Sequence, residues 1–552
     1  MNPMNSGNKL VKIRYQYYAF GILLISISIN LLRMTHWGRP SGEPGFDDIS
    51  YLVAGGNRFR LTEEFGLIRG ILSYWYSPAH SPILELLAHF SISISGFTNS
   101  IIYIIYALIM HLTLILIYKL IFRNQIIVMY ASAFSIASPF GDFISNNFRP
   151  DVAWTFWTVI SILYLNNLSI NNYKRRLILS SVSIMIAAYF KPSYIFLHFL
   201  IILIILGWLL FFSLQIKFLF ELFRNRLKVV LRLWIFPLLI FGFLYWTKNT
   251  VEAIQYNFRL RREGVFTKPI GIETVELMIN SIVNLIRIEF GAWLSSIFFL
   301  TIITALYSIY FLIKNRSTVR IDFNFLIFFS SIPFTTTFVL FLGGHGGAFF
   351  AFHIVFQWLI FGIVLISVTP QPKEILNQLF GKFYIGRTGS NLVAAILLFI
   401  ILCQSMIPAK SWSRSPDQLR QTKPNKELAV SLLKWCEKLT YSCDSLNIIA
   451  VGAADVNSHN VNWELMRLGS YNIVVQPVSI LSTASELRKS INNFDAILFV
   501  SDVARANDDL PFNKARFDLI PEIKSGNTMF KFLHQPISVS NWGLIAVNTR
   551  LK

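Results

Sequence analysis

Residues 15–32 read YQYYAFGILLISISINLL, an apolar stretch about as long as a helix must be to cross the hydrocarbon core of a bilayer. Lys9, Lys12 and Arg14 come shortly before it. The stretch is longer than the core of a signal peptide, and it lacks a small-x-small cleavage pattern. We therefore expect it to be retained as a membrane anchor.

Apolar composition continues along most of the chain. Of its 552 residues, 54% are hydrophobic and 14% are charged, whereas about 25% are charged in a typical soluble protein. The apolar residues gather in blocks of roughly spanning length. These blocks are 15–33, 99–121, 124–140, 152–168, 175–190, 193–213, 229–247, 292–313, 323–342, 348–368 and 391–408. They predict a polytopic α-helical membrane protein with about 11 transmembrane helices.

The basic residues orient these helices. Another apolar stretch, 78–96, contains Glu85 and His89 at helical spacing, so we expect it to be interfacial and not to cross. With eleven crossings, most Lys and Arg of the loops fall on the cytoplasmic side, as the positive-inside bias requires. The net charge of +20 therefore does not indicate nucleic-acid binding. In this topology the C-terminal tail is extracytoplasmic.

The first long outer loop contains two adjacent acids, Asp47 and Asp48, in GEPGFDDISYLVAGGNRF (residues 42–59). Carboxylates are costly near a bilayer and usually serve chemistry or ion handling there. A helix over 48–59 would bring Asp47 onto one face with Ser50 and Tyr51. The alternative is that Asp47 caps this helix, which needs only one acid.

The same loop continues with a second apolar segment, 66–75, which we expect to form a helix lying on the membrane. The loop thus predicts two juxtamembrane helices on the outer side, next to the acidic pair.

Two shorter outer loops carry charge at helix ends. Arg149 and Asp151 lie where a helix begins in SPFGDFISNNFRPDVAWTFW (138–157), and Lys191 and Tyr194 lie in YFKPSYIF (189–196). The topology puts both loops on the side of the acidic pair, so we expect a shared pocket in which Lys191 contacts a phosphate. For Asp151 the alternative is a favourable place at a helix N-terminus.

Two further segments leave alternatives open. A second long outer loop, 250–291, has a basic cluster that is either solvated or contacts phosphate; its members are Arg259, Arg261, Arg262 and Lys268. His345 stands in GGHGG (343–347), where glycines either allow close approach to a ligand or make a tight turn.

After a polar linker, 409–425, the composition becomes that of a soluble domain, 426–552. Short apolar runs predict buried strands, and the segments between them have helical patterns. The predicted strands are Leu446–Val451, Tyr471–Val478, Asp495–Val500 and Gly543–Val547, and the predicted helices are Lys426–Leu439, Val461–Leu468 and Thr483–Ile491. We therefore expect a small α/β domain.

This domain lacks a G-x-G-x-x-G turn after its first strand, so we expect it to support the membrane domain or to bind the acceptor. Cys436 and Cys443 are close enough in sequence to form a disulfide on the outer side of the membrane.

Together these motifs resemble the GT-C superfamily of membrane glycosyltransferases, and most of all the protein O-mannosyltransferase and lipid A aminoarabinose transferase group. The resemblance covers about residues 10–370. It rests on FDDISY after the first helix, the Ser77–Pro82 entry to the next segment, RPD in the second outer loop and KP in the third. The family usually has Asp-Glu where this chain has Asp-Asp.

The resemblance implies that residues 1–408 form a catalytic domain in a multi-pass membrane protein, which in a bacterium would lie in the plasma or inner membrane. It implies inverting transfer of a hexosyl or pentosyl group from a polyprenyl-phosphate carrier to a glycan, lipid or protein acceptor on the extracytoplasmic face. The implied catalytic residues are Asp47, Asp48 and Asp151, and the implied substrate-binding residues are Tyr51, Arg149, Lys191, Tyr194, Arg259 and His345.

Glycosyl transfer from a lipid phosphate requires carboxylates and cations of this kind, because an acceptor hydroxyl needs a base and a departing phosphate needs a cation. Asp47 and Asp48 could hold Mg²⁺ or Mn²⁺, although no His/acid cluster has definite ligand spacing. The alternatives to an enzyme are a transporter or flippase for a lipid-linked or anionic solute and a non-catalytic assembly subunit. A transporter usually carries its charges at mid-membrane and often has repeats, neither of which this sequence displays.

Overall fold

The computed structural model describes most of the chain. The described residues are 4–37, 46–76, 81–122, 124–166, 168–213, 216–217, 220–240, 255, 272–289, 299, 301–304, 306, 310, 323–342, 348–368, 423–437, 445–451, 458–478, 483–500, 511–532 and 543–549. The chain forms two compact units. The membrane unit comprises Met1–Gly38, Tyr74–Ile83 and Tyr103–Ser413, and the second unit comprises Arg39–Ser73, Leu84–Ile102 and Arg414–Lys552.

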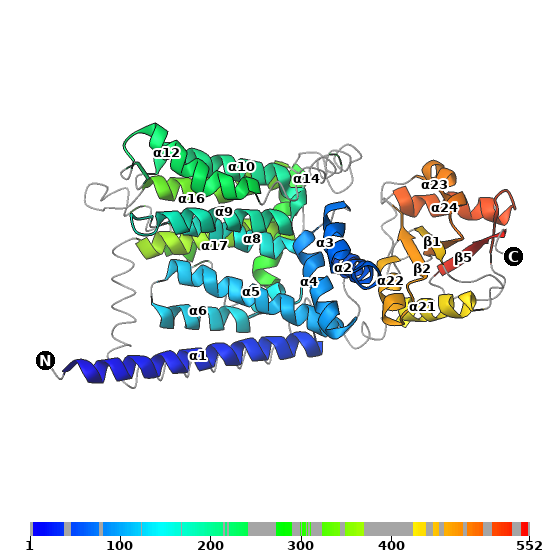
Figure 1. The fold of residues 1–552 in the computed structure, drawn as a ribbon, viewed down its shortest axis with the longest axis horizontal. Helices are drawn as coiled ribbons and strands as arrows, with labels where there is room; N and C mark the ends of the chain where they lie inside the picture. Colours follow the sequence, from blue (N-terminus) through cyan, green and yellow to red (C-terminus); the bar gives the residue numbers. More distant parts are fainter. Residues whose placement is uncertain are drawn as a thin grey trace. The chain divides into compact units, whose positions relative to one another are not determined.

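The membrane unit is a bundle of apolar helices that lie side by side (Figure 1). Its helices are α1 (Met4–Trp37), α5 (Asn99–Ile121), α6 (Gln125–Ala137), α7 (Pro139–Ser145), α8 (Pro150–Leu165), α9 (Tyr173–Phe190), α10 (Ile195–Gly207), α12 (Phe223–Val230), α14 (Ile272–Asn284), α16 (Phe323–Leu342) and α17 (Ala348–Val368). A short 3₁₀ turn, η2 (Pro192–Tyr194), joins α9 to α10. Helices suit this setting because lipid offers no partner to backbone N–H and C=O groups.

Four described helices are long and apolar enough to cross a membrane: Gln16–His36, Ser100–Ile121, Pro192–Phe212 and Asn324–Phe341. Helices α6 and α7 would make a fifth span if they count as one, but they are bent by 76° at Ser138. The chain is thus a polytopic helical membrane protein, as predicted. The number of eleven crossings stays a prediction, since the blocks at 229–247, 292–313 and 391–408 lie partly or wholly outside the described residues.

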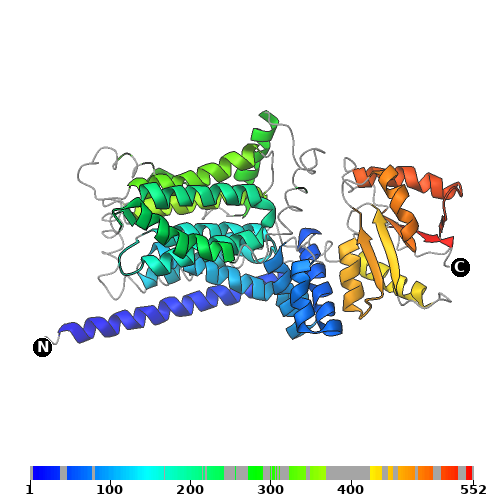
Figure 2. The same ribbon diagram turned by 45° about the horizontal axis from the view of Figure 1, so that its top comes forward.

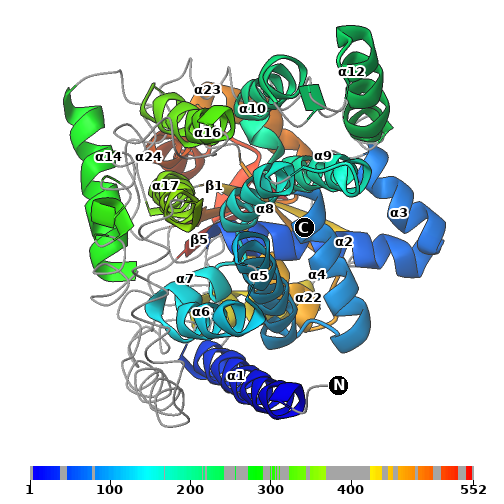
Figure 3. The ribbon, with the colours of Figure 1, turned by 90° about the vertical axis from the view of Figure 1, so that its left-hand side faces the viewer.

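Three helix ends meet at one end of this bundle. Helix α8 packs against α9 and α17, and Figure 3, which views the bundle from its other end, shows these three helices as neighbours. The start of α8, the end of α9 and the start of α17 lie together there, because side chains from all three are in contact. The loops that precede α8 and follow α9 therefore open on the same side of the bundle.

The second unit contains the juxtamembrane helices α2 (Phe46–Phe65), α3 (Leu67–Tyr76) and α4 (Pro82–Ser95). The two predicted outer helices are confirmed, although α2 starts earlier and ends later than 48–59. At about 1.5 Å per residue, the 14 residues of α4 measure about 21 Å, less than the roughly 30 Å of a hydrocarbon core. Helix α4 is therefore too short to cross, as its charged residues suggested.

A polar ladder joins α4 to α2. Glu85 accepts a hydrogen bond from Arg58 Nε at 3.0 Å, and both side chains are buried. One turn further on, the His89 ring lies 3.2 Å from the hydroxyl of Thr62. About one turn before Arg58 the helices touch, since a Cβ on Gly55 would lie 2.5 Å from the Cβ of Ala88. The charges that looked out of place in an apolar segment are thus paired across a tight helix crossing.

The C-terminal domain is a three-layer α/β sandwich. Its five strands, in the order β2-β1-β3-β5-β4, are β1 (Leu446–Val451), β2 (Ile473–Pro477), β3 (Ala496–Val500), β4 (Phe530–Phe532) and β5 (Gly543–Asn548). Strands β1, β2 and β3 are parallel, and β5 and β4 are antiparallel additions. The helices are α21 (Lys423–Cys436), α22 (Ser458–Arg467), α23 (Ala484–Ser490) and α24 (Pro511–Lys524).

Alternate residues of the strands build two apolar cores. Ile448 and Ala450 face α21 and α22, whereas Ile449 and Val451 face α23 and α24, and Figure 2 shows helices on both sides of the strands. The predicted α/β domain and its four strands are confirmed. Strand β4 was missed because three residues at a sheet edge are too few to reveal an alternating pattern.

Within the second unit the C-terminal domain packs on α2. Phe97 lies 5.4 Å from the ring of Trp463 and 6.1 Å from that of Tyr471. Arg60 donates to the carbonyl of Tyr471 at 2.9 Å and lies over its ring. Gly56 leaves room for Met466, whose sulfur would be 2.9 Å from a Cβ there. The helix that carries the acidic pair is therefore joined directly to the soluble domain.

Cys436, at the end of α21, is disulfide-bonded. The chain has three cysteines, and the other two, Cys403 and Cys443, lie outside the described residues. A disulfide is typical of a domain in an oxidising compartment.

Candidate active site

The site is built around the carboxylate of Asp151, in the first turn of α8. Arg149 is the extended residue before the helix and Pro150 is its first residue, a position that needs no N–H donor. The Asp151 side chain is buried, with 5% of its surface exposed. Its oxygens contact side chains from α9, η2 and α17, so capping of its own helix does not account for its position.

Lys191 supplies the cation for this carboxylate. It ends α9, and its Nζ lies 3.2 Å from Oδ1 and 3.4 Å from Oδ2 of Asp151. About 15% of the lysine side chain is exposed, so it is the more accessible partner of the pair.

Tyr194 and His353 complete the cluster. The Tyr194 hydroxyl lies 3.3 Å from Asp151 Oδ1 and 3.0 Å from His353 Nε2. The other ring nitrogen of His353 contacts the hydroxyl of Thr155 on α8. The rings of Trp154, Tyr194 and His353 pack edge to face, with centroids 4.8–5.3 Å apart. This aromatic packing fixes the polar groups in place.

Arg149 adds positive charge to the same place. Its guanidinium interacts electrostatically with Asp151. Its backbone carbonyl accepts a hydrogen bond of 2.7 Å from the hydroxyl of Tyr106 on α5. The structure therefore brings together four predicted site residues: Arg149, Asp151, Lys191 and Tyr194.

A second buried ion pair lies in the segment before α8. Arg33 of α1 meets Asp142 of α7 at 2.5 Å. Asn30 donates to Asp142 at 3.0 Å, Ser145 donates to Asn30 at 2.8 Å, and the His111 ring is 2.9 Å from Ser145. This network ties α1, α5 and α7 together at a depth where unsatisfied polar groups are costly. Asp142 lies in the same stretch, 138–157, as the predicted site residues Arg149 and Asp151.

The other predicted residues are placed only in part. Asp47 lies in the first turn of α2, with its side chain outside the described residues, and Arg259 and His345 are not described. Asp48 and Tyr51 are buried in the second unit. Among the described residues, no three His, Cys, Asp or Glu side chains gather as they would around a metal ion.

His89 and Tyr471, which both contact α2, have pKa values that are shifted by their surroundings. Burial lowers the pKa of His89, and the nearby Arg58 cation lowers it further. Burial raises the pKa of Tyr471, Glu63 raises it further, and Arg60 opposes the change. The ladder between α2 and α4 thus favours a neutral histidine.

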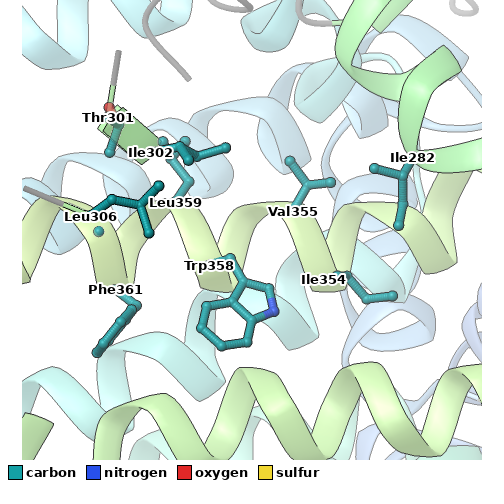
Figure 4. A pocket seen from close by; sticks show the side chains of 10 residues that line it. Ile282, Thr301, Ile302, Leu306, Ile354, Val355, Trp358, Leu359 and Phe361 are labelled. Carbon is teal, nitrogen blue, oxygen red and sulfur yellow. The ribbon is translucent and has the colours of Figure 1, made fainter. Parts of the chain in front are cut away.

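An apolar cavity of about 330 Å³ lies beside α17. Figure 4 shows Ile354, Trp358 and Phe361 of α17 facing it, with Ile282 of α14 and Leu306 on other sides. Thr301 is the most polar of its lining side chains. Ile354, which lines the cavity, follows His353 in sequence. The two side chains lie on different faces of α17, since His353 faces Thr155 of α8.

No protein-family model and no curated protein matches the chain. Among solved structures it is similar to ArnT from Cupriavidus metallidurans bound to undecaprenyl phosphate, at 11% identity over 99% of this chain and 98% of that one, with a TM-score of 0.49. It is also similar to the Archaeoglobus fulgidus oligosaccharyltransferase in the apo form, at 12% identity over 88% of this chain and 70% of that one (TM-score 0.45). The same oligosaccharyltransferase in complex with Zn and sulfate matches at 12% identity over 95% and 72% (TM-score 0.47).

Sequence reasoning missed His353 and Thr155. The available signal was a histidine inside an apolar segment, since ionisable groups at such positions are rare and usually functional. The glycines around His345 favoured that histidine instead, although the histidine that contacts Asp151 is His353, eight residues later.

Proposed function

We propose that the protein is a membrane glycosyltransferase that transfers a sugar from a polyprenyl-phosphate-linked donor to an acceptor on the extracytoplasmic face. The observation that carries the proposal is the Asp151–Lys191 pair, 3.2 Å apart and supported by Tyr194 and His353 where three apolar helices end. Buried charges cost stability, so such a cluster at the end of a bundle is best explained by function.

Lys191 and Arg149 would stabilise the donor's phosphate. As the bond from the sugar to the phosphate oxygen breaks, negative charge develops on that oxygen, and preorganised cations lower the barrier most where charge develops. Lys191 is held by Asp151 and Tyr194, so little reorganisation is needed when the donor arrives. Arg259 and His345 are further candidates for contacts with the donor.

Asp47 would be the base that takes the proton of the acceptor hydroxyl, with Asp48 as its partner and Tyr51 on the same helix. In an inverting reaction the acceptor attacks the anomeric carbon from the side opposite the leaving phosphate. If a divalent cation takes part, Asp47 and Asp48 are the residues we would assign to it, and it would supply charge neutralisation.

The carrier's hydrocarbon chain needs an apolar place near the phosphate site. The cavity beside α17 offers one, because its lining is almost wholly aliphatic and aromatic. Its 330 Å³ would accept a few isoprene units of a longer chain that otherwise lies in the lipid.

Two features support an extracytoplasmic site. The positive-inside bias puts the Asp151 and Lys191 loops outside. The disulfide at Cys436 suits an oxidising compartment, and the C-terminal domain that contains it packs on the acid-bearing α2.

The test is sugar transfer by the purified full-length protein in liposomes, supplied with a panel of polyprenyl-phosphate sugars and candidate acceptors. We expect release of polyprenyl phosphate to depend on acceptor, and Lys191→Met to reduce it at least about 100-fold, as loss of a transition-state cation does. Movement of intact donor across the bilayer without release of phosphate would favour a flippase instead. Full activity of Lys191→Met would refute the assignment of the site.

A further inference from the structure

Asp151 has two different counter-groups around one oxygen. Lys191 Nζ lies 3.2 Å from Oδ1. On the other side the Tyr194 hydroxyl lies 3.3 Å and His353 Nε2 lies 3.6 Å from the same atom. A carboxylate that needed only Lys191 as its cation would not require the additional contacts with Tyr194 and His353.

The hydrogen bonds of His353 and Tyr194 allow two arrangements of their protons. The Thr155 hydroxyl donates to the backbone carbonyl of Asp151 at 3.0 Å, so toward His353 it accepts, and Nδ1 of the ring carries a proton. In a neutral ring Nε2 then accepts from the Tyr194 hydroxyl at 3.0 Å. In a charged ring Nε2 donates, and the Tyr194 hydroxyl turns to Asp151.

The charge balance decides between these arrangements. While Lys191 neutralises Asp151, a charge on the buried His353 would be uncompensated and costly. When Lys191 and Arg149 both turn to a phosphate, as proposed above, Asp151 is left without a cation. Loss of one partner of a buried pair is strongly unfavourable unless another replaces it.

We propose that His353 takes up one proton and replaces Lys191 as the counter-ion of Asp151 when Lys191 binds the carrier's phosphate, while the Tyr194 hydroxyl changes its acceptor from Nε2 to the carboxylate. This rests on the proposed function, since it presupposes a lipid phosphate at Lys191. One proton from solvent adds to Nε2 on binding and returns on release, and no bond to carbon changes. His353 is thus a positioning residue that makes Lys191 available.

The other groups that face His353 do not offer the same exchange. The indole N–H of Trp154 is donated to His198 at 2.9 Å, and its ring only packs on His353. Arg149 is a permanent cation and cannot vary its charge over the physiological range. Among the described residues in contact with Asp151, the histidine alone is of a type whose ordinary pKa lies between about pH 5 and 8.

The test measures proton uptake directly. Undecaprenyl phosphate is titrated calorimetrically into the full-length protein in detergent at about pH 7, in two buffers of different ionisation enthalpy. The proton number is compared between wild type, His353→Gln, which cannot become charged, and His111→Gln, a matched change at a buried histidine of α5 that contacts Ser145. The lipid's own ionisation is common to all three and cancels.

We expect wild type and His111→Gln to take up about one proton more than His353→Gln, with a pH dependence of affinity that is up to tenfold steeper for each pH unit. Tyr194→Phe keeps the ring packing but removes the hydroxyl from both arrangements, so it should move the midpoint of this dependence, which provides a second test if His353→Gln does not fold. Equal proton uptake by wild type and His353→Gln, or an unmoved midpoint in Tyr194→Phe, would overturn the exchange. Absence of lipid binding by wild type would instead refute the proposed donor, and the exchange with it.

Discussion

Replacing Gly55 with alanine should separate α2 from α4. The added Cβ would lie 2.5 Å from the Cβ of Ala88 and 2.9 Å from two backbone atoms of α4, whereas carbon atoms in contact are about 3.5–4.0 Å apart. A backbone cannot move aside as a side-chain end can. The helices must therefore move apart by about 1 Å.

The energetic consequence follows from what bridges the two helices. Alanine would gain about 1 kcal/mol of helix propensity over glycine, and overpacking costs about 1–3 kcal/mol. The larger penalty comes from the 3.0 Å bond of Arg58 to Glu85, because a fully broken buried pair costs about 3–5 kcal/mol. With that bond partly lost, we expect a net destabilisation of about 2–4 kcal/mol.

The assay is thermal unfolding of the purified full-length protein in detergent, combined with limited proteolysis of the second unit. The matched control is Gly21→Ala in α1, where nothing lies within 4 Å of the new Cβ, so stability should stay the same or rise. Adding Ala88→Gly to Gly55→Ala should restore part of the loss, since it removes the nearest clash. If Gly55→Ala is as stable as Gly21→Ala, the tight crossing is not present in solution.

Three further outcomes are expected. Asp47→Asn should abolish sugar transfer and leave the melting temperature unchanged, because it removes only the proposed base; normal transfer would contradict that role. Arg58→Met should destabilise the second unit more than Arg58→Met combined with Glu85→Leu, because the single change leaves Glu85 buried without its cation; chemical denaturation of both compares them. Stability of the second unit should fall as pH drops below about 6.5, where the unfolded chain binds a proton that burial and Arg58 deny to His89. His89→Gln should flatten that pH dependence, and an unchanged profile would exclude His89 as its source.

Local pattern was sufficient for most of the fold. Apolar blocks of spanning length identified the membrane helices, and short apolar runs identified strands such as Leu446–Val451. The grouping of Asp151 with Lys191 was also within reach, because topology puts the loops of successive helix pairs on one side. The predicted topology assigns the loops of Asp151 and Lys191 to the same side of the membrane, which is enough to predict that the two residues can meet.

The sequence did not predict which buried polar residues pair with one another across the helices of the bundle. Periodicity shows which face of a helix is polar but not which other helix that face meets. Arg33 and Asp142 are 109 positions apart in sequence, and Thr155 and His353 are 198 apart. The ladder of Arg58 and Thr62 with Glu85 and His89 was a closer case, since both pairs have the same four-residue spacing. A single sequence offers many such pairs, and packing selects among them.

The direct contact of α2 and Phe97 with the C-terminal domain has a consequence for biosynthesis. Residues 39–102 leave the ribosome long before residues 414–552, a delay of roughly 15–60 s at about 5–20 residues per second. During that time the surface around Gly56 and Phe97 lacks Trp463 and Tyr471. The juxtamembrane helices are thus completed by a part of the chain that is made much later, so a chain that ended before residue 414 would present an open apolar surface that quality-control proteases can recognise.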